Sequence, residues 1–441
     1  MNLSETLVVV IGLGRSGIAA ANLCINRGAK VVATDLRTRE SIGEDILALE
    51  KRGAVLCLGG HDQVPWDKAK LAVVSPGVPK FAALLEFEKS GREVISEIEL
   101  ASRFISAPIV VIGGTNGKST VTTWTGAMLA RGGRRVFVGG NLGTPLAEVV
   151  DQCWDIVVLE ISSFQAERVP TLHPKACALL NVTDDHLDRY VDFDDYANAK
   201  GNVFVNMRET DVAVIPVGDA ICEKQAKRGN ARLVTFGRAG DIYADETQLV
   251  DKVWGGKYPL QTLALPGAHN QLNACVSIAL ASALGATRED IGYVLANFKG
   301  LAHRTALVGE VSQIRFYDDS KGTNVGASVA ALVGVREKKA VLIAGGRDKL
   351  GSYGPLVEAL RTKGRALVVI GEAAERIADA ANGVVPIVHA DSMKSAVKAA
   401  RDLAEPGDAV LLSPACSSFD MFRDYKHRGQ AFCEAVAELI A

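Results

Sequence analysis

The sequence lacks the features that membrane-spanning, secreted and nucleic-acid-binding proteins show. A membrane-spanning helix needs roughly 18 or more apolar residues in a row, and the longest apolar run, near Ala274–Ala286, is shorter and rich in small residues. Residues Met1–Thr6 contain no basic group, so a signal peptide is not expected. The formal net charge is −2 with both signs interspersed, so no basic surface for nucleic acid or an anionic membrane is expected.

The cysteine pattern also argues against a secreted protein. The eight cysteines form no Cys-x-x-Cys pair and lie mostly within apolar segments, which favours reduced, buried thiols in a cytoplasmic protein. Apolar residues make up 48% of the chain and charged residues 23%, as in an ordinary globular protein. At 441 residues, and with about 150 residues per domain, the chain is expected to form about three domains.

Glycine is abundant, with 43 residues, and the most informative glycine turn lies at 113–117. The apolar run 109–112 predicts a short buried strand before the turn, and the residues from Lys118 onward are compatible with a helix. Backbone N–H groups in such a turn and the positive end of the helix bind phosphate. Lys118 would neutralise nucleotide phosphates, and the Ser119 hydroxyl would ligate Mg²⁺. The match to the standard loop is imperfect, because Ile112 stands where a glycine is expected.

The N-terminal region has a second strand, glycine turn and helix. Gly12, Gly14 and Gly17 form a G-x-G-x-x-G pattern after the strand-like run 7–11, and a second predicted strand ends at Asp35. This spacing fits a dinucleotide fold in which Asp35 accepts a hydrogen bond from a ribose hydroxyl or a base N–H. Taken alone, the glycine pattern is a weak signal. Further strands at Val55–Leu58 and Leu71–Val74 and the turn Ser75–Pro79 continue an open α/β sheet.

Polar groups follow the predicted strands of the middle region. The strands are expected at Arg135–Val138, Asp155–Glu160 and Ala176–Val182. Asn141, Glu160 and His186 lie at or beyond their carboxyl ends, where neighbouring parallel strands share one crevice. Glu160 could hold Mg²⁺ beside the phosphate loop or be a solvated strand-end carboxylate. His186, within an acidic turn, could be a second metal ligand or a structural histidine.

The rest of the chain continues the α/β pattern. Residues 211–265 are less regular and predict a small sheet, and a helix with Asn270 and Asn273 near its start follows. Beyond 299–304 a third α/β unit is expected. Its strands are predicted at Gln313–Tyr317, Ala340–Ala344, Ala366–Ile370, Val384–Val388 and Ala409–Leu412. The predicted domains are therefore 1–96, 97–300 and 301–441.

Several short motifs together resemble those of the Mur ligases, the ATP-dependent amide-forming enzymes of bacterial peptidoglycan assembly. In chain order they are Gly-Thr-Asn-Gly-Lys-Ser (114–119), Leu-Glu-Ile-Ser-Ser-Phe-Gln (159–165), Leu-Asn-Val-Thr-Asp-Asp-His-Leu-Asp (180–188), Ala-Lys (199–200), Pro-Gly-Ala-His-Asn (266–270), His-Arg (303–304) and Asp-Ser-Lys-Gly-Thr-Asn (319–324). The N-terminal Gly-Leu-Gly-Arg-Ser-Gly and Ser-Pro-Gly-Val-Pro and the C-terminal Leu-Ser-Pro-Ala-Cys-Ser-Ser-Phe-Asp-Met-Phe extend the resemblance over essentially the whole length. These N-terminal and C-terminal motifs narrow the resemblance to the family members that add D-glutamate.

The resemblance implies a fold and a reaction. It implies an N-terminal Rossmann-like domain that binds the UDP substrate, a central P-loop ATPase domain and a C-terminal Rossmann-like domain that binds the amino acid. The implied substrates are ATP, UDP-N-acetylmuramoyl-L-alanine and D-glutamate, with Mg²⁺ as cofactor and an acyl phosphate as intermediate. A cytoplasmic monomer without nucleic-acid partners or a membrane span is expected. The domains are expected to close on the substrates, with hinges near 96–100 and 299–304.

The resemblance also implies roles for individual residues. For ATP these are Gly114, Thr115, Asn116, Gly117, Lys118, Ser119, Thr120, Asn270, Asn273, His303, Arg304 and Asp319. For the UDP substrate they are Gly14, Arg15, Ser16, Asp35, Arg37, Ser75, Gly77, Asn141 and His186. For D-glutamate they are Thr323, Lys349, Ser418, Phe419 and Tyr425, and Gly322 stands where other members often have alanine.

The implied metal ligands are Ser119 and Glu160 for one Mg²⁺, and His186 and Lys200 for the other. The implied catalytic residues are Lys118, His186 and Lys200. A protonated lysine cannot bind a cation, and in similar family members CO₂ carbamylates the matching lysine, which requires the neutral amine. Without the family, Lys200 would be interpreted as an exposed lysine on a helix.

Other interpretations remain. Other Mur ligases and the folylpolyglutamate synthetases share the central motifs, but the Asp-Asn-Pro-Arg motif of the diaminopimelate-adding enzyme is absent. Folate ligases lack the N-terminal glycine-motif domain. An NAD(P)-dependent oxidoreductase would explain Gly12–Asp35 but would leave Lys118 and Glu160 without a role. A nucleotide-regulated binding protein without catalysis is a third possibility.

Overall fold

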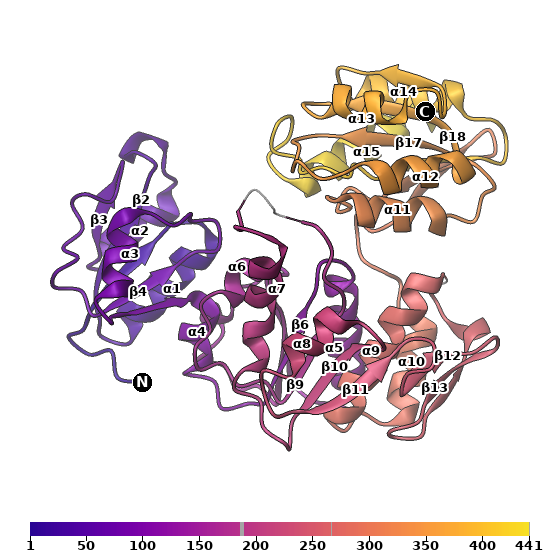
Figure 1. Cartoon of the computed structure of the whole chain (residues 1–441). Helices are drawn as coiled ribbons and strands as arrows, with labels where there is room; N and C mark the ends of the chain where they lie inside the picture. The colour runs from indigo at the N-terminus through magenta and orange to yellow at the C-terminus, as the bar shows by residue number, and fades with distance from the viewer. Residues whose placement is uncertain (186–188, 266, 441) are drawn as a thin grey trace. The chain divides into compact units, whose positions relative to one another are not determined.

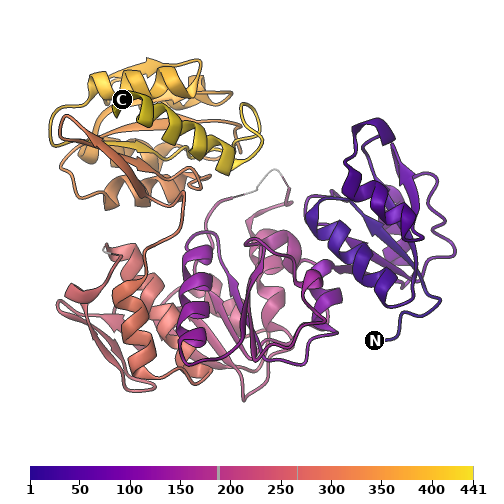
Figure 2. The same cartoon turned by 180° about the vertical axis from the view of Figure 1, so that it is seen from behind.

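A computed structural model describes residues 1–185, 189–265 and 267–440. Within these residues the strands form three sheets, each flanked by helices (Figures 1 and 2). The contacts divide the chain into two compact units. Unit 1 comprises 1–182, 194–263 and 272–297, and unit 2 comprises 183–193, 264–271 and 298–441.

The N-terminal sheet is the Rossmann-like sheet that the glycine pattern predicts. Its elements are β1 (Leu7–Ile11), α1 (Arg15–Asn26), β2 (Lys30–Asp35), the 3-10 helix η1 (Arg39–Ser41), α2 (Glu44–Lys51), β3 (Val55–Leu58), β4 (Leu71–Val74), α3 (Ala82–Lys89) and β5 (Glu93–Ser96). The strands are parallel in the order β3-β2-β1-β4-β5. The strand order therefore reverses between β1 and β4, where open α/β sheets bind ligands.

The central sheet carries the predicted phosphate loop. Helix α4 (Glu97–Ser102) leads to β6 (Ile109–Gly113), β7 (Val136–Gly140), β8 (Ile156–Glu160), β9 (Ala176–Leu179), β10 (Val212–Pro216), β11 (Arg232–Phe236), β12 (Ile242–Ala244), β13 (Gln248–Asp251) and β14 (Lys257–Pro259). The order is β14-β13-β12-β11-β10-β9-β6-β8-β7. The less regular region 211–265 thus extends this sheet, ending in antiparallel strands, and does not form a separate one.

Helices of the central region cover the buried parallel strands. They are α5 (Lys118–Arg131), α6 (Ser163–Ala166), α7 (Phe193–Gly201), α8 (Ala220–Ala226), α9 (Ala268–Ala283) and α10 (Arg288–Asn297), with 3-10 helices η2 (Leu146–Glu148), η3 (Asn202–Phe204) and η4 (Leu260–Thr262). Helix α5 packs against β7, β8 and α10, and its Trp124 is fully buried. Strand β6, with all five residues buried, is central enough to fix the phosphate loop that follows it.

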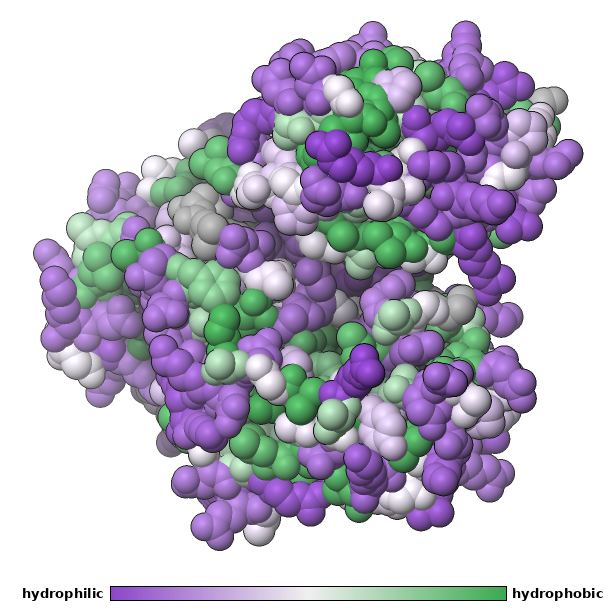
Figure 3. All heavy atoms as spheres, turned by 45° about the vertical axis from the view of Figure 1, so that its right-hand side comes forward, coloured by the Kyte–Doolittle hydropathy of each residue, from purple (hydrophilic) through white to green (hydrophobic). Residues whose placement is uncertain are grey.

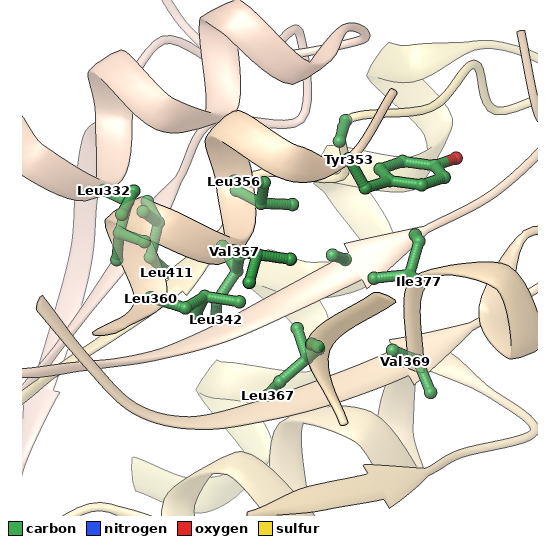
Figure 4. Close-up of a cluster of buried hydrophobic side chains, with 14 of the residues drawn as sticks. Leu332, Leu342, Tyr353, Leu356, Val357, Leu360, Leu367, Val369, Ile377 and Leu411 are labelled. Atoms are coloured by element: carbon green, nitrogen blue, oxygen red, sulfur yellow. The ribbon is translucent and has the colours of Figure 1, made fainter. Parts of the chain in front are cut away.

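The C-terminal sheet has helices on both faces. Its elements are β15 (Ala306–Val311), β16 (Ile314–Asp318), α11 (Val325–Gly334), β17 (Ala340–Gly345), α12 (Gly354–Lys363), β18 (Gly364–Ile370), α13 (Ala374–Ala381), β19 (Ile387–His389), α14 (Met393–Leu403), β20 (Ala409–Leu412) and α15 (Tyr425–Ile440). Helices α11, α12 and α13 cover one face around Leu342 and Leu367 (Figure 4). Helices α14 and α15 cover the other face, around Ile343 and Phe432.

Three details differ from the sequence-based expectations. Strands β5 and β15 were not predicted, because each is a short edge strand and β15 has no continuous apolar run. The strand expected at Val384–Val388 lies at Ile387–His389 instead. Val384 belongs to the turn after α13, and Pro386, which has no N–H to donate, contributes only its carbonyl, to Leu367 N. The fold class, three α/β domains, is confirmed, whereas the domain boundaries stay predictions.

The surface is that of an ordinary globular protein. Figure 3 shows hydrophilic residues over most of one face, with hydrophobic residues in scattered groups. Single exposed apolar side chains are normal on such a surface. In the part of the chain that the structure describes, no helix combines the length and the hydropathy that a membrane crossing requires.

Candidate active site

The loop after β6 has the conformation that a phosphate-binding loop needs. Gly114 and Gly117 have φ angles of +138° and +87°, a region that favours glycine. Gly117 also has no room for a side chain, because a Cβ there would lie 2.6 Å from Asn273 Oδ1. The loop ends at the N-terminus of α5, so its backbone N–H groups and the helix dipole share one place. Ile112 belongs to the buried strand, so the missing glycine does not disturb the loop.

Asn181 holds this loop from the neighbouring strand β9. Its Oδ1 accepts hydrogen bonds from the N–H groups of Thr115 and Asn116, at 3.1 and 2.9 Å, and its Nδ2 donates to Asn116 O. The Lys118 ammonium lies over the same loop and donates to the carbonyls of Gly114 and Thr115, at 2.9 and 2.8 Å. No role was expected for Asn181, which lies within the predicted strand Ala176–Val182 but follows the end of β9 in the structure.

Ser119 and Glu160 meet as the sequence predicts. Ser119 Oγ donates to Glu160 Oε2 at 2.5 Å, and Asn141 Nδ2 donates to Glu160 Oε1 at 2.6 Å. The Glu160 carboxylate is buried at the end of β8. Asn141, which was expected to bind the UDP substrate, directs its side-chain hydrogen bond to Glu160 in this structure. A buried carboxylate and a hydroxyl, both oxygen ligands, are the donors that Mg²⁺ prefers.

Lys200 lies at the phosphate loop and is not an exposed helical lysine. It is near the end of α7, only 5% exposed, and its Nζ donates to Gly114 O at 2.8 Å. The ammonium also lies 4.6 Å from the ring centroid of Tyr196, whose hydroxyl is 3.1 Å from Thr115 Oγ1. Lys118 and Lys200 thus donate to the same carbonyl oxygen. Two ammonium groups this close repel each other, and burial adds to the cost of charging both.

The second predicted metal position involves Lys200 and His186. His186 lies outside the described residues, so its assignments as a catalytic, UDP-binding and metal-binding residue stay predictions. Among the residues that are described, no group of three or more His, Cys, Asp and Glu side chains is arranged to hold a metal ion. The Ser119 and Glu160 pair, with only one carboxylate, is compatible with a Mg²⁺ that also binds nucleotide phosphates.

The N-terminal glycine turn brings its loop close to α1. Gly12 has a φ angle of +80°, and a Cβ at Gly17 would lie 1.9 Å from Gly12 O. Ser75, at the carboxyl end of β4, donates its hydroxyl to Gly12 O at 2.6 Å. Gly14 and Gly77 have open space where a Cβ would project. The carboxyl ends of β1 and β4 and the start of α1 therefore form one edge, with Ser16 in the first turn of α1.

Asp35 is occupied by internal partners. Its carboxylate accepts from Leu13 N at 2.7 Å, and from the Nε and Nη2 atoms of Arg37 at 2.9 and 2.8 Å. Burial acts to raise the pKa of Asp35, but these hydrogen bonds and the charge of Arg37 outweigh it and lower the pKa to about 2. In this structure Asp35 therefore orients Arg37, and its predicted contact with the UDP substrate stays a prediction. Arg15 pairs with Glu148 instead, 3.4 Å away.

In the C-terminal unit, Asp319 is the centre of a polar network. Its Oδ2 accepts from Ser413 Oγ at 2.6 Å, and its Oδ1 accepts from Thr305 N at 3.1 Å. Burial raises the pKa of Asp319 to about 6, although Ser413, the charge of Arg304 and Thr305 oppose the shift. A Cβ at Gly322 would lie 2.4 Å from Asp319 Oδ2, so an alanine at this position would require the Asp319 side chain to move.

The residues predicted to bind D-glutamate lie on the loops that follow strands of the C-terminal sheet. Lys349 forms an ion pair with Asp185 at 3.0 Å, a partner that the sequence analysis did not propose. Ser418 is 3% exposed, whereas the Phe419 side chain is largely exposed. Tyr425, at the start of α15, contacts the His303 ring, with 6.0 Å between centroids. Their assignment to the amino acid, with that of Thr323, stays a prediction.

A fully buried arginine connects these loops. Arg428 donates to Ser320 O and Cys416 O at 2.9 and 3.1 Å, and to Ser417 O at 3.2 Å. Burial lowers the pKa of Arg428 to about 10, although nearby acidic groups oppose the shift. No sequence pattern pointed to Arg428, because only tertiary contacts distinguish it from a surface arginine on a helix. Two asparagines were predicted to lie at or near the adenine. Asn273 lies against Gly117, and Asn270 lies in the first turn of α9.

Comparison with known proteins identifies the family. Three family models match consecutive parts of the chain: "Mur ligase MurD-like, N-terminal domain" at residues 6–96, "Mur ligase middle domain" at 112–281 and "Mur ligase, glutamate ligase domain" at 303–416. The UDP-N-acetylmuramoylalanine--D-glutamate ligase of Geobacter metallireducens is 41% identical over 448 aligned residues, covering 100% of this chain and 99% of the relative. That of Desulfosudis oleivorans is 42% identical, covering 98% and 96%.

Solved structures share the fold at low sequence identity. A pseudomurein peptide ligase type C from Methanothermus fervidus has a TM-score of 0.63 at 18% identity, covering 99% of this chain and 100% of that one. MurF ligase from Thermotoga maritima, in complex with ADP, has a TM-score of 0.61 at 18% identity, covering 93% and 95%. Together with the full-length relatives, the three models show that this chain belongs to the Mur ligase family, with a MurD-like N-terminal domain.

Proposed function

We propose that this protein is an ATP-dependent ligase that joins D-glutamate to UDP-N-acetylmuramoyl-L-alanine. The full-length relatives that carry this name support the substrates. The observation that carries the chemistry is the phosphate loop, where Ser119 bonds Glu160 at the start of α5 and Lys200 bonds the Gly114 carbonyl. An oxidoreductase would have no use for this second loop, so the N-terminal glycine turn serves the UDP group and not NAD.

ATP would bind along the central loop and the start of α5. Backbone N–H groups of 114–120 would meet the phosphates, and Lys118 would move from its two loop carbonyls onto phosphate oxygens. Asn273, whose side-chain amide lies beside Gly117, would meet the adenine. The ADP complex of the similar Thermotoga maritima MurF supports nucleotide use by this fold.

Mg²⁺ would be held by Ser119 and Glu160, with the second ion at His186 and a carbamylated Lys200. Bound there, the ions would stabilise the negative charge that develops on the phosphoryl and carboxylate oxygens. Carbamylation requires Lys200 as a neutral amine, and its Nζ lies at the phosphate loop on the carbonyl that Lys118 also contacts. The carbamate would then replace one of two repelling cations with a carboxylate.

The proposed reaction has two steps, phosphorylation of the alanyl carboxylate and formation of the amide. A carboxylate oxygen of the alanyl group attacks the γ-phosphorus of ATP, forming a C–O–P bond and releasing ADP. The neutral amine of D-glutamate then attacks the acyl carbon, and the tetrahedral intermediate expels phosphate as the amide forms and the amine loses its proton. The phosphorylation is needed because a free carboxylate is a poor electrophile.

The two other substrates would bind at opposite ends of the chain. Gly14, Arg15, Ser16, Asp35, Arg37, Ser75 and Gly77 would hold the UDP group on the N-terminal sheet, with Asn141 and His186 near the sugar. Lys349, Thr323, Ser418, Phe419 and Tyr425 would hold D-glutamate, and the Lys349 ammonium suits one of its carboxylates. His303, Arg304 and Asp319 would meet the ribose and phosphates. A monomer in the cytoplasm is expected.

Phosphate release tests this proposal. The enzyme is supplied with ATP, Mg²⁺ and UDP-N-acetylmuramoyl-L-alanine, and D-glutamate is compared with L-glutamate, L-alanine, meso-diaminopimelate and no amino acid. Release that requires both the UDP-sugar and D-glutamate is expected. Release with another amino acid would keep the family and overturn the substrate, and no release despite tight ATP binding would favour a non-catalytic nucleotide-binding protein.

A further inference from the structure

The turn that carries His303 has an unusual backbone. His303 and Thr305 have φ angles of +62° and +47°, which non-glycine residues rarely adopt. Residues in this conformation are strained and persist only where surrounding contacts determine them. Lys321 N donates to His303 O at 3.1 Å, and Thr305 N donates to Asp319 Oδ1 at 3.1 Å. The turn is therefore held in place by the segment that follows β16.

The His303 ring is held by a buried carboxylate. Its Nδ1 lies 2.6 Å from Asp318 Oδ2, and the Asp318 side chain is 3% exposed. The other oxygen, Oδ1, accepts from Ser320 N at 2.9 Å. Asp318 must therefore accept on both oxygens, which places a proton on Nδ1 of His303. The second ring nitrogen, Nε2, has no hydrogen-bond partner within the described part of the chain.

Helix α15 is shaped to this pair. A Cβ at Gly429 would lie 2.3 Å from His303 Nδ1 and 2.8 Å from Asp318 Oδ2, so only glycine lets the helix approach this closely. One turn earlier, the Tyr425 ring meets the His303 ring edge to face, at an interplanar angle of 81°. The His303 ring is thus held by the hydrogen bond at Nδ1 and by packing against Tyr425 and Gly429. The His303 side chain is 20% exposed.

From this geometry we propose that Asp318 is a positioning residue that fixes the tautomer and direction of the His303 ring, so that Nε2 is available as a hydrogen-bond acceptor for a ribose hydroxyl of ATP. The inference rests on the proposed function, in which His303 meets the nucleotide. Asp318 itself touches no substrate. Its effect passes through His303, as a carboxylate behind a functional imidazole commonly fixes which nitrogen carries the proton.

The test variant is Asp318→Asn. The amide has one acceptor, which Ser320 N requires, so its NH₂ group faces Nδ1 and forces the proton of His303 to Nε2. We expect KM for ATP to rise about tenfold, with KM for the UDP-sugar and D-glutamate unchanged within about twofold. In a His303→Ala background Asp318→Asn should have no further effect, because the two residues act as one unit. Additive effects of the two substitutions would overturn the proposal.

A second readout needs no turnover. With isotopically labelled histidine in the full chain, nitrogen NMR should show one of the seven histidines protonated at Nδ1, with its signal lost in His303→Ala and its proton moved to Nε2 in Asp318→Asn. An unchanged tautomer would refute the inference. If the parent enzyme showed no ligase turnover, the proposed function would be refuted. The NMR result would still show whether Asp318 fixes the tautomer of His303.

Two further variants complete the design. Gly429→Ala pushes the ring away from the carboxylate from the opposite side and should raise KM for ATP in the same way. A folded Gly429→Ala protein with unchanged KM would contradict the inference. Glu375→Gln is the matched control, since Glu375 pairs with His389 at 3.6 Å on the surface of the same unit, and its loss should leave every KM as in the parent.

Discussion

At the scale of single residues, the position of Lys200 carries the most chemistry. Its ammonium and that of Lys118 lie on one carbonyl oxygen, and Lys200 is 5% exposed. Burying an ammonium beside a second, half-buried one is costly, because desolvation and repulsion both oppose it. A carbamate on Lys200 would remove the repulsion and supply oxygen atoms for Mg²⁺. The residue-level prediction therefore concerns the chemical state of one side chain.

Lys200→Ala should lower kcat by about 100-fold or more, because it removes a ligand that would stabilise the transferring phosphoryl group. ATP binding, measured separately, should weaken far less, since Lys118 and the loop amides remain. Labelled bicarbonate should give a carbamate NMR signal in the parent enzyme that is absent from this variant.

The matched control is Lys224→Ala, which removes an exposed lysine, 3.8 Å from Asp194, on the neighbouring helix α8. It should keep both activity and the carbamate signal. A carbamate signal that survives Lys200→Ala would show that another amine reacts.

At the scale of elements, the first glycine turn determines how α1 packs on its sheet. Gly17→Ala should destabilise the protein by about 3 kcal/mol or more, because its Cβ would lie 1.9 Å from the backbone oxygen of Gly12. Gly14→Ala should lower the free energy of unfolding by less than about 1 kcal/mol. Nothing lies within 4 Å of a Cβ at Gly14, and its φ of −76° is one that alanine adopts. Denaturant unfolding of the two variants measures the difference. Equal losses would mean that the close approach of α1 is not needed.

Helix α4 carries a buried carboxylate, that of Glu97, with a hydrogen-bond partner for only one of its two oxygens among the described residues. Glu97 is 2% exposed, its Oε1 accepts from Ala147 N at 2.6 Å, and its Oε2 has no hydrogen-bond partner among the described residues. Burial raises the pKa of Glu97 to about 7, Ala147 N opposes this, and the charge of Glu148 adds to it. The folded state therefore prefers the protonated carboxyl more than the unfolded state does.

The sign of the pH dependence follows from this raised pKa. Below the unfolded value of 4.5 Glu97 is protonated in both states, and as the pH rises through about 7 the folded state must charge it. That charging lowers the free energy of unfolding by up to about 3 kcal/mol. Glu97→Gln keeps an acceptor for Ala147 N without the charge. The variant should be more stable than the parent at pH values above 7, and the difference should narrow as the pH falls toward 5.

Tryptophan fluorescence is suited to this measurement, because all four tryptophans lie in unit 1, as Glu97 does. Glu50→Gln, which removes an exposed carboxylate paired with Arg39, is the control and should show a difference that does not vary over this pH range. A pH-independent difference for Glu97→Gln would show that the carboxyl does not titrate there.

At the scale of the whole molecule, the contact-based division between the two units falls between Asn297 and Phe298, beside the expected hinge at 299–304. The other expected hinge, 96–100, is tied to the central region, since Ser96 N donates to Arg168 O and Glu99 accepts from Leu172 N, both at 2.9 Å. Both hinges stay predictions. Residues proposed for ATP lie in both units and those proposed for D-glutamate lie in unit 2, so we predict that the units close on the substrates.

Solution scattering should therefore show a smaller radius of gyration when an ATP analogue, Mg²⁺ and the UDP-sugar are added together, because closure excludes water from the acyl phosphate. Lys118→Ala, with weakened phosphate binding, should respond only at higher nucleotide concentration. An unchanged scattering curve in the presence of all ligands would count against closure.

The sequence by itself determined the fold class, most strands and the order of the motifs, because these depend on local periodicity and turn chemistry. Ser119 and Glu160 were predictable together, since parallel strands bring their carboxyl ends to one edge. The tertiary structure alone decided that Lys200 is buried at the loop, that Asn181 holds it, that Asp35 orients Arg37 and that Asp318 holds His303. Except for Asp35 and Arg37, which are two residues apart, these contacts join residues whose separation along the chain carries no periodic signal, so only the packed backbone brings them within hydrogen-bonding distance.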